Sequence, residues 1–540
     1  MAIESTDQED KLRSEHGPLH WFLVNIKRVV ISHVLRHKLV YCSLGWASLL
    51  VAFALRATVQ PIFIWIRLHV FDLVLISTLV LGVMIVSKKL AEKGKRLRRT
   101  TKLIAFIFVI ALVRVEVYSY FANYLRYCHL KEIDLEELPT TDFERVQPIE
   151  SLRTLADGVM DQNRHPSEPD FVRIGDKYRF TMAVEPDTWQ TRLMGTIDEI
   201  IDIPGNAASP DFSKDSRHQV GFAIGEHMFL GKNSRTAIIK TFPLWRFFSY
   251  APGDVKYIQD DKGEMVEIVS LSRLSGSWWS RWVFPWPEFG GVIVIRQSQG
   301  GLLHALKRVF FGDGTWIPPE NIHEYAFLRG QNLVPYDVSR YAARSFRFER
   351  SFWAPCPIGN HNGDTMIPDL KDSKNDMPYT VYAKFGADGD EQNKLYHYFA
   401  LEPWQNTQHG LSDSLFFPAD GIGKPLVFRH YKRDEGTHGV ATVDSQVRGS
   451  DIHVDWSHAL PIEHRPWIHD IAGKRRLMWL TTVVTFKDGS NRMSASSMPN
   501  IILTDARTGR SLWAKATHPE GWVAEVEKDY LDSVDKQKIK

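Results

Sequence analysis

The chain has 540 residues, of which 44% are hydrophobic and 24% are charged, and its formal net charge is +2. A charge this close to zero gives no reason to expect a nucleic-acid partner, and three cysteines do not define a disulfide framework. The mean hydropathy of -0.23 is ordinary for a soluble protein, so membrane segments have to be sought locally.

Three apolar runs lie between Leu39 and Leu125, and no comparable run follows. They cover residues 39–55, 71–86 and 103–121. The first carries no charge and is as long as a short helix must be to cross roughly 30 Å of hydrocarbon. We therefore predict three transmembrane α-helices within residues 39–127. Core helices of a soluble protein are the alternative.

The loop at residues 88–102, between the second and third runs, is strongly basic. It contains eight Lys or Arg residues against one acid, Glu92. Short loops of this kind stay cytoplasmic, which predicts a cytoplasmic N-terminus and an extracytoplasmic chain after about residue 128, periplasmic in a bacterium. The basic residues expected to face lipid are Lys88, Lys89, Lys95, Arg96, Arg98 and Arg99.

Three charged residues fall inside the apolar runs: Asp72, Arg114 and Glu116. At 1.5 Å per residue all three lie at a similar depth, near the outer edge of the hydrocarbon. Charges there are costly unless they are paired or solvated. We expect a structural clamp between Asp72 and Arg114, and a proton or ion pathway is the alternative.

Residues 1–38 form a basic arm without a cleavable signal peptide, so the first span itself is expected to direct insertion. The last part of this arm suits a helix at the inner membrane interface, or a connecting helix packed on the bundle. Between the first two spans, at residues 56–67, Pro61 is expected to break the helix and Trp65 to lie at the interface.

Residues 128–169 form an acidic connector, in which residues 150–163 favour a short amphipathic helix. From about Asp170 the pattern changes to short alternating runs bounded by turn residues, which predicts a large, β-rich α+β domain. Its first lobe is expected at 170–300, with a hairpin turn at 261–263. The expected strands are 178–185, 218–225, 236–242, 265–273 and 290–296.

A helical insert is predicted at residues 301–375, with helices at 301–311 and 318–328 and a third after Asp337. A second β-rich lobe is expected at 376–540 and ends in a helix that begins at Pro519. The strands expected in this lobe are 380–385, 395–403, 426–431, 438–447, 480–486, 500–504 and 511–515.

The densest cluster of metal-binding residue types lies between His453 and Asp470. Its members are His453, Asp455, His458, Glu463, His464, His469 and Asp470. Imidazole and carboxylate are zinc ligands, but no HExxH is present and two prolines prevent the histidines from sharing one helical face. A solvated loop is therefore expected, and a metal site is the alternative. His361 and Asp364 are expected in a turn.

Aromatic residues gather in the segment 276–290. They are Trp278, Trp279, Trp282, Phe284 and Trp286, interrupted by Arg281. A short strand cannot bury so many large rings on one side. We predict contact with the outer membrane surface or with another subunit, where Trp and Arg are enriched. Ordinary core packing is the alternative.

These patterns predict a structural or assembly subunit of a larger envelope complex, non-enzymatic, with the lipid bilayer and other protein chains as partners and no nucleic acid. Glycine-rich phosphate loops, dinucleotide fingerprints and nucleophile elbows are missing from the sequence, so no cofactor is predicted. The alternatives are an oligomeric channel or transporter subunit and a metal-dependent hydrolase that uses the His453 to Asp470 cluster. A disulfide between Cys128 and Cys356 stays open at this point.

Overall fold

The computed structural model describes residues 38–91, most of 119–515, and residue 528. Within 119–515 the segments outside the description are 142–147, 162, 176, 207–211, 213–215, 276–283, 298–301, 357–360, 362, 370–376, 386–393, 405–409, 423–424, 433–434, 451–453, 472–473, 487–492 and 495–499. The basic arm, the loop after Ala91 and the helix expected from Pro519 therefore fall almost wholly outside it.

A single helix of 54 residues, α2 (Lys38–Ala91), contains both of the first two apolar runs. The expected break at Pro61 is wrong, because the helix continues through it. A proline removes one backbone donor and kinks a helix, but the apolar residues on either side offer the backbone no better hydrogen-bond partner. The chain does divide there into two compact units, Met1–Val59 and Gln60–Lys540.

By length and composition, one helical segment of the described chain can cross a membrane. It is Ser43–Ile66, with a mean hydropathy of 1.8. This segment is compatible with a membrane anchor or a signal sequence, and its orientation is not determined. The third apolar run lies almost entirely outside the described residues, so the three-span arrangement stays a prediction.

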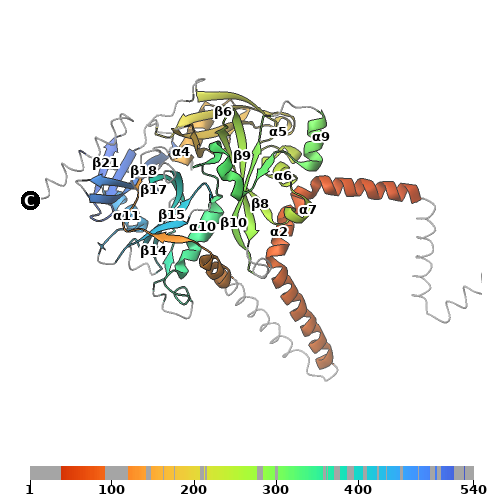
Figure 1. Ribbon diagram of the computed structural model, residues 1–540, viewed down its shortest axis with the longest axis horizontal. Coiled ribbons are helices and arrows are strands. Elements are labelled where there is room, and N and C mark those ends of the chain that lie inside the picture. The colour runs from red at the N-terminus through yellow and green to blue at the C-terminus, as the bar shows by residue number, and fades with distance from the viewer. Residues whose placement is uncertain are drawn as a thin grey trace, which may run out of the picture. The chain divides into compact units, whose positions relative to one another are not determined.

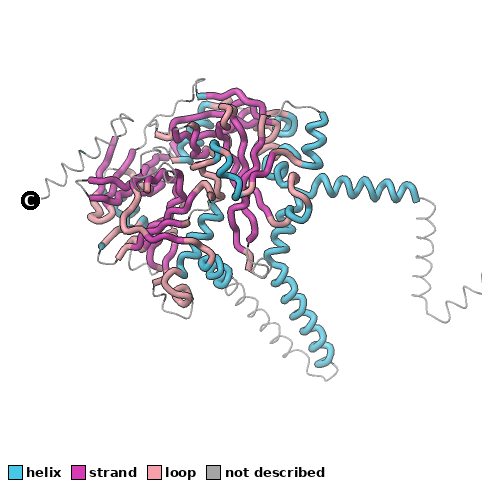
Figure 2. Tube along the Cα trace, in the orientation of Figure 1, coloured by secondary structure: helices cyan, strands magenta, loops and turns pink. Residues whose placement is uncertain are grey.

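Strands dominate the chain after residue 130 (Figure 2). One antiparallel sheet contains β3 (Arg164–Pro166), β4 (Asp170–Ile174), β5 (Lys177–Pro186), β6 (Ile197–Pro204) and β7 (Arg217–Phe222). A second contains β8 (Tyr250–Gln259), β9 (Met265–Ser275), β10 (Trp286–Ile295) and β11 (Thr315–Ile317). The predicted hairpin turn is confirmed between β8 and β9, where Gly263 adopts a φ of 81° that favours glycine.

A third sheet runs in the order β1-β16-β15-β14-β13-β2, and β12 pairs with β14. Its strands are β1 (Glu132–Asp134), β2 (Thr140–Thr141), β12 (Thr365–Met366), β13 (Tyr379–Lys384), β14 (Lys394–Pro403), β15 (Asp413–Pro418) and β16 (Leu426–His430). The fourth sheet comprises β17 (Ala459–Ile471), β18 (Lys474–Phe486), β19 (Met493–Ser494), β20 (Asn500–Asp505) and β21 (Ser511–Lys515). The region is therefore a large β-rich α+β fold with several antiparallel sheets; the lobe boundaries stay a prediction.

The helices expected near residues 150, 301 and 337 are confirmed as α4 (Ile149–Val159), α9 (Leu302–Phe311) and α10 (Tyr336–Ser345). Residues 318–328 form two 3-10 helices instead of one α-helix, η3 (Pro319–Glu324) and η4 (Ala326–Leu328). The extended backbone of Tyr325 separates them. Four further short helices are α5 (Trp189–Met194), η2 (Leu230–Lys232), α7 (Leu244–Phe247) and η5 (Phe346–Phe348).

Two expected strands are helices. Residues 236–242 belong largely to α6 (Ser234–Ile239), because the Asn233 side chain caps the helix by accepting from the Thr236 amide. Residues 438–447 overlap α11 (Val440–Ser450), which buries Val440, Val443 and Val447. These three valines are spaced three and four residues apart, as on one face of a helix. Burial of this face outweighs the preference of the β-branched residues for a strand.

The expected loop around His464 is also wrong, since residues 459–471 form strand β17. This strand lies at the edge of its sheet and pairs with β18. An edge strand tolerates Pro461 and Pro466, which cannot donate to a ladder. The two C-terminal sheets share one core, which includes Tyr398, Phe399 and Trp479.

Candidate functional site

A cleft of about 620 Å³ opens at one end of the third sheet, where the ends of β14, β15 and β16 meet the turn at residues 361–364. Arg350, His361, Asp364, Trp404, Ser412 and His430 are among its lining residues. Its size is in the range of small-molecule sites. The polar groups come from segments far apart in the sequence, and two of them are histidines paired with buried carboxylates.

The first pair joins His430 to Asp413. The antiparallel register places these two residues directly opposite each other, on β16 and β15. The Asp413 side chain is 2% exposed, and its Oδ1 lies 2.8 Å from His430 Nδ1. The hydrogen bond to Asp413 raises the pKa of His430, although burial opposes it. Nδ1 is therefore committed to the carboxylate, and Nε2 lies 3.3 Å from Arg350 Nη2, on the side of the ring that a ligand of Arg350 would approach.

The second pair joins His361 to Asp364 within one turn. His361 Nδ1 lies 3.1 Å from Asp364 Oδ2, and the Asp364 side chain is fully buried. Arg347 holds the carboxylate in a bidentate contact, from Nε at 3.1 Å and from Nη2 at 2.7 Å. His361 has a φ of 48°, a left-handed conformation that is unusual for a residue other than glycine and is found most often at functional sites.

Trp404 supplies the aromatic wall of the cleft. Its indole lies 5.4 Å from the His361 ring at an interplanar angle of 17°, and its backbone N–H donates to the Asp364 carbonyl at 3.0 Å. It follows β14 in the chain and is 43% exposed. An exposed Trp in a polar cleft offers a ligand an apolar surface beside the charged groups.

Arg350 lies between the two pairs. A side chain added at Gly363, beside the His361 turn, would lie 2.9 Å from Arg350 Cδ, so only glycine leaves room for the arginine stem. At its other end, Arg350 Nη2 donates to Ser412 Oγ at 3.1 Å and lies 3.1 Å from His430 Nδ1. The guanidinium is thus fixed at its position before any ligand arrives.

The electrostatics of the cleft favour an anion. Arg347 pairs with Asp364 and His430 with Asp413, whereas the nearest carboxylate given for Arg350 is the longer contact of its Nε with Glu349 Oε2, at 3.7 Å. Lys432 adds an exposed ammonium to the same lining. Within the described part of the chain, no group of three His, Cys, Asp or Glu residues is arranged to hold a metal.

A helix at residues 119–128 precedes the third sheet in the chain, which follows in Figure 1 as strands of several colours, and it contacts η5. Phe348 of η5 contacts the rings of Tyr120 and Tyr124 at 4.9 and 5.5 Å, and the preceding residue, Arg347, holds Asp364 in the cleft. Tyr120 also bonds the carbonyl of Phe352. Arg347 and Phe348 therefore connect Asp364 of the cleft to the helix at residues 119–128.

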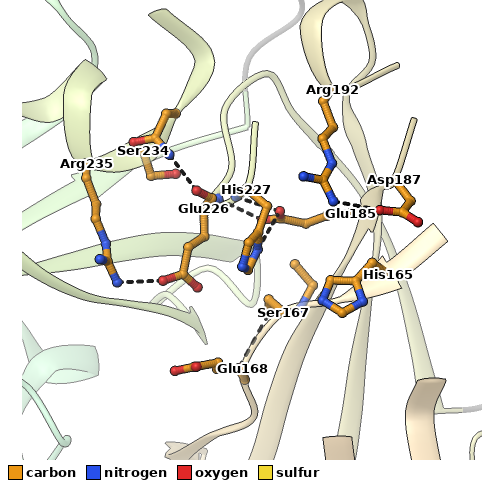
Figure 3. Close-up of polar contacts among 12 residues, drawn as sticks. His165, Ser167, Glu168, Glu185, Asp187, Arg192, Glu226, His227, Ser234 and Arg235 are labelled. Atoms are coloured by element: carbon orange, nitrogen blue, oxygen red, sulfur yellow. Dashed lines mark hydrogen bonds and ion pairs between the residues drawn. The ribbon is translucent and has the colours of Figure 1, made fainter. Parts of the chain in front are cut away.

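A second polar cluster surrounds Glu185 at the end of β5 (Figure 3). The buried Glu185 carboxylate accepts from the backbone N–H groups of Glu226 and His227 at 2.7 Å each, and from His227 Nδ1 at 3.1 Å. This bond to Glu185 raises the pKa of His227. Three of the donors belong to one loop, so the carboxylate fixes the loop between β7 and α6, which is a structural role.

Most of the residues singled out from the sequence fall where their side chains are not described. Phe284 is half-buried and 6.0 Å from Phe121, and Trp286 is 1% exposed and donates to Glu288. Trp286 thus packs inside the molecule. The prediction that the aromatic segment 276–290 contacts the membrane or another subunit therefore depends on its other aromatic residues. Those outside the description are Trp278, Trp279, Arg281, Trp282, Arg114, Glu116, Lys95, Arg96, Arg98 and Arg99, and the side chains of Asp72, Lys88 and Lys89.

The histidines between 453 and 470 do not converge in the described structure. His464 is buried and its Nδ1 bonds Thr481 Oγ1 at 2.8 Å, whereas His458 lies at an exposed turn, 2.6 Å from Asp455. Cys128 and Cys356 are both free. Sequence reasoning placed His361 and Asp364 in a turn, which is confirmed, but missed Arg350, Trp404 and His430, because their neighbours come from distant segments.

Comparison with family models, with curated proteins and with solved structures finds no match for this chain.

Proposed function

We propose that the chain is a membrane-anchored protein whose large domain binds a small anion in the cleft, with a planar or apolar part of the ligand against Trp404. The observation that carries this proposal is the position of Arg350, whose Nη2 donates to Ser412 Oγ and lies beside the His430 ring. A fixed guanidinium fork binds phosphate or carboxylate oxygens in two parallel bonds without losing much side-chain entropy.

Titration of the full chain in detergent with phenyl phosphate tests the proposal. We expect saturable binding with one site per chain, and we expect Arg350→Met to weaken it by roughly 10- to 100-fold, since a hydrogen bond to a charged group is worth about 1.5–3 kcal/mol. Arg507→Met is the matched control, because Arg507 is exposed and is not part of the cleft lining. Equal affinities for the two variants would contradict the proposal.

The finer membrane arrangement belongs to the same proposal: three spans, a cytoplasmic N-terminus and an extracytoplasmic domain. Its support is the aromatic collar around residues 119–128, formed by Tyr120, Phe121, Tyr124, Phe352 and Trp353. Trp353 is 68% exposed, and Trp and Tyr concentrate at membrane interfaces. The exposed thiol of Cys128, kept as the single cysteine, should react with an impermeant maleimide from outside intact cells; protection until lysis would reverse the orientation.

An assembly role is a second candidate, favoured by an exposed apolar patch on α5, η2 and α9. Phe229 donates its N–H to the Arg192 carbonyl, and Gly231 lies against Val309, so these elements are adjacent. The exposed members are Trp189, Met194, Phe229, Leu306, Val309 and Phe311. Monomeric proteins rarely expose large contiguous patches of this kind.

Extraction in mild detergent should give a particle much heavier than one chain. We expect Met194→Lys with Phe311→Lys, and separately Trp279→Ser with Trp282→Ser, to release the monomer, because each change places a polar or smaller group where an apolar contact is proposed. Arg507→Glu, an exposed change outside α5, η2 and α9, is the control. A wild-type chain that is monomeric on extraction would rule out the assembly role.

A further inference from the structure

We propose that the two histidine–carboxylate pairs of the cleft hydrolyse a phosphodiester by metal-independent general acid–base catalysis. This rests on the anion-binding cleft proposed above, and it adds a substrate class and a reaction. His361 acts as the base, His430 as the acid, and Arg350 binds the phosphoryl oxygens between them.

The geometry of the pairs supports these roles. In each, Nδ1 is bonded to a buried carboxylate, at 3.1 Å for His361 and 2.8 Å for His430. This contact fixes the tautomer and the ring orientation and makes Nε2 the nitrogen for proton transfer, which in His430 lies 3.3 Å from Arg350 Nη2. Both rings line the same cleft. Arg350 connects them, since its stem packs at Gly363 and its Nη2 reaches His430.

The charge of the cleft selects the substrate. A phosphodiester carries one negative charge and two ester arms, which fits one guanidinium and one aromatic wall better than a neutral ester would. Arg350 stabilises charge that develops on the non-bridging oxygens, and one ester arm lies against Trp404. A carboxylic ester would instead need an activated nucleophile and an oxyanion hole.

The proposed step balances without a cofactor. Neutral His361 takes a proton from water as the water oxygen bonds to phosphorus. The bond from phosphorus to the leaving oxygen breaks, and protonated His430 gives its proton to that oxygen. The products are a phosphomonoester and an alcohol, and the proton on His361 returns to His430 through solvent.

The position of the cleft points to the substrate's source. Phe348 and Arg347 are neighbours in η5, the first against Tyr120 and Tyr124 in the aromatic collar and the second bound to Asp364. A phosphodiester within a lipid headgroup would therefore be close to the cleft. A water-soluble diester, such as a dinucleoside monophosphate, offers the same chemistry.

The first test measures hydrolysis of bis(4-nitrophenyl) phosphate by the full chain in detergent with excess EDTA. We expect turnover that His361→Gln and His430→Gln each reduce by roughly 10²–10⁴-fold, the usual contribution of a general acid or base. His304→Gln, an exposed histidine on α9, should keep the wild-type rate. Phenyl phosphate binding, measured in parallel, should survive in both cleft variants within a few-fold.

The pH–rate profile of Asp413→Asn is a second test. It should change if His430 acts as the acid, and it should stay the same if His430 has only a structural role. Asp413 raises the pKa of His430, Glu349 adds to this effect and Arg350 opposes it. Loss of the carboxylate lowers that pKa, so the acid form of His430 is lost at lower pH. The alkaline limb of the pH–rate profile should therefore shift to lower pH, while the acidic limb stays in place.

The outcomes separate this proposal from the ligand-binding one. Two results would overturn the catalytic proposal alone. One is that the chain binds phenyl phosphate but does not hydrolyse bis(4-nitrophenyl) phosphate; the other is that both histidine variants hydrolyse bis(4-nitrophenyl) phosphate at the wild-type rate. Failure to bind would overturn both. Loss of phosphatidylglycerol from nanodiscs, followed by mass spectrometry, would assign a lipid substrate; cleavage of a dinucleoside monophosphate alone would assign a soluble one.

Discussion

Replacing Asp420 by alanine is expected to destabilise the domain by roughly 3–5 kcal/mol, because it removes the carboxylate that pairs with the buried Lys394 ammonium. The two side chains form an ion pair and each is 3% exposed. Lys394 begins β14, and Asp420 follows Ala419, whose carbonyl accepts from the N–H groups of Leu333 and Val334. The pair therefore lies where the third sheet meets the chain that precedes α10.

The double variant Lys394→Met with Asp420→Leu tests the explanation. Removing both charges eliminates the uncompensated ion, so most of the lost stability should return. Thermal unfolding of the detergent-solubilised full chain is the measurement. Asp157→Ala, which breaks a half-exposed contact with His165, should change stability by less than about 1 kcal/mol. A double variant as unstable as Asp420→Ala would mean that packing, and not charge, dominates at this position.

Stability should fall as the pH rises from about 5 to about 7, through Glu402. Burial raises the pKa of this group from 4.5 to about 7. Between these values the folded chain holds a proton that the unfolded chain has released, so raising the pH favours unfolding. Above pH 7 the free energy of unfolding is lower than at pH 4 by about 3 kcal/mol, because each unit of pKa shift corresponds to about 1.36 kcal/mol.

Glu402→Gln should remove this pH dependence, because glutamine resembles the protonated carboxyl and can still accept from the Ala441 N–H at the start of α11. The variant and the wild type should have equal melting temperatures near pH 5, and the variant should be more stable at pH 8. Glu136→Gln, at an exposed position, should follow the wild type at every pH. Parallel curves for Glu402→Gln and the wild type would place the titrating group elsewhere.

The strands that the sequence predicted correctly carry their signal locally. Residues 265–273 and 290–296 alternate or are continuously apolar between turn residues, and they form β9 and most of β10. The errors at α6 and α11 have the opposite origin. There β-branched residues favour a strand, but a cap at Asn233 or a helical face at Val440, Val443 and Val447 decides the outcome.

The cleft could not be predicted from the sequence because its contacts are long-range. Asp413 pairs with His430 only once β15 and β16 adopt their register, and β15 was not among the expected strands. Arg347 reaches Asp364 across a turn, and Arg350 reaches Ser412 across 62 residues. The one local indication of the cleft in the sequence was the pair His361 and Asp364. From sequence this pair indicates an ordinary turn, and only the structure shows the positive φ of His361 and the burial of Asp364.

A crystal structure of the full chain with phenyl phosphate would test the central claim, that the cleft binds an anionic ligand, most directly. We expect phosphate oxygens within hydrogen-bond distance of the Arg350 guanidinium, with the phenyl ring against Trp404. A ligand bound at another surface, with the Arg350 guanidinium making no contact with it, would contradict the claim.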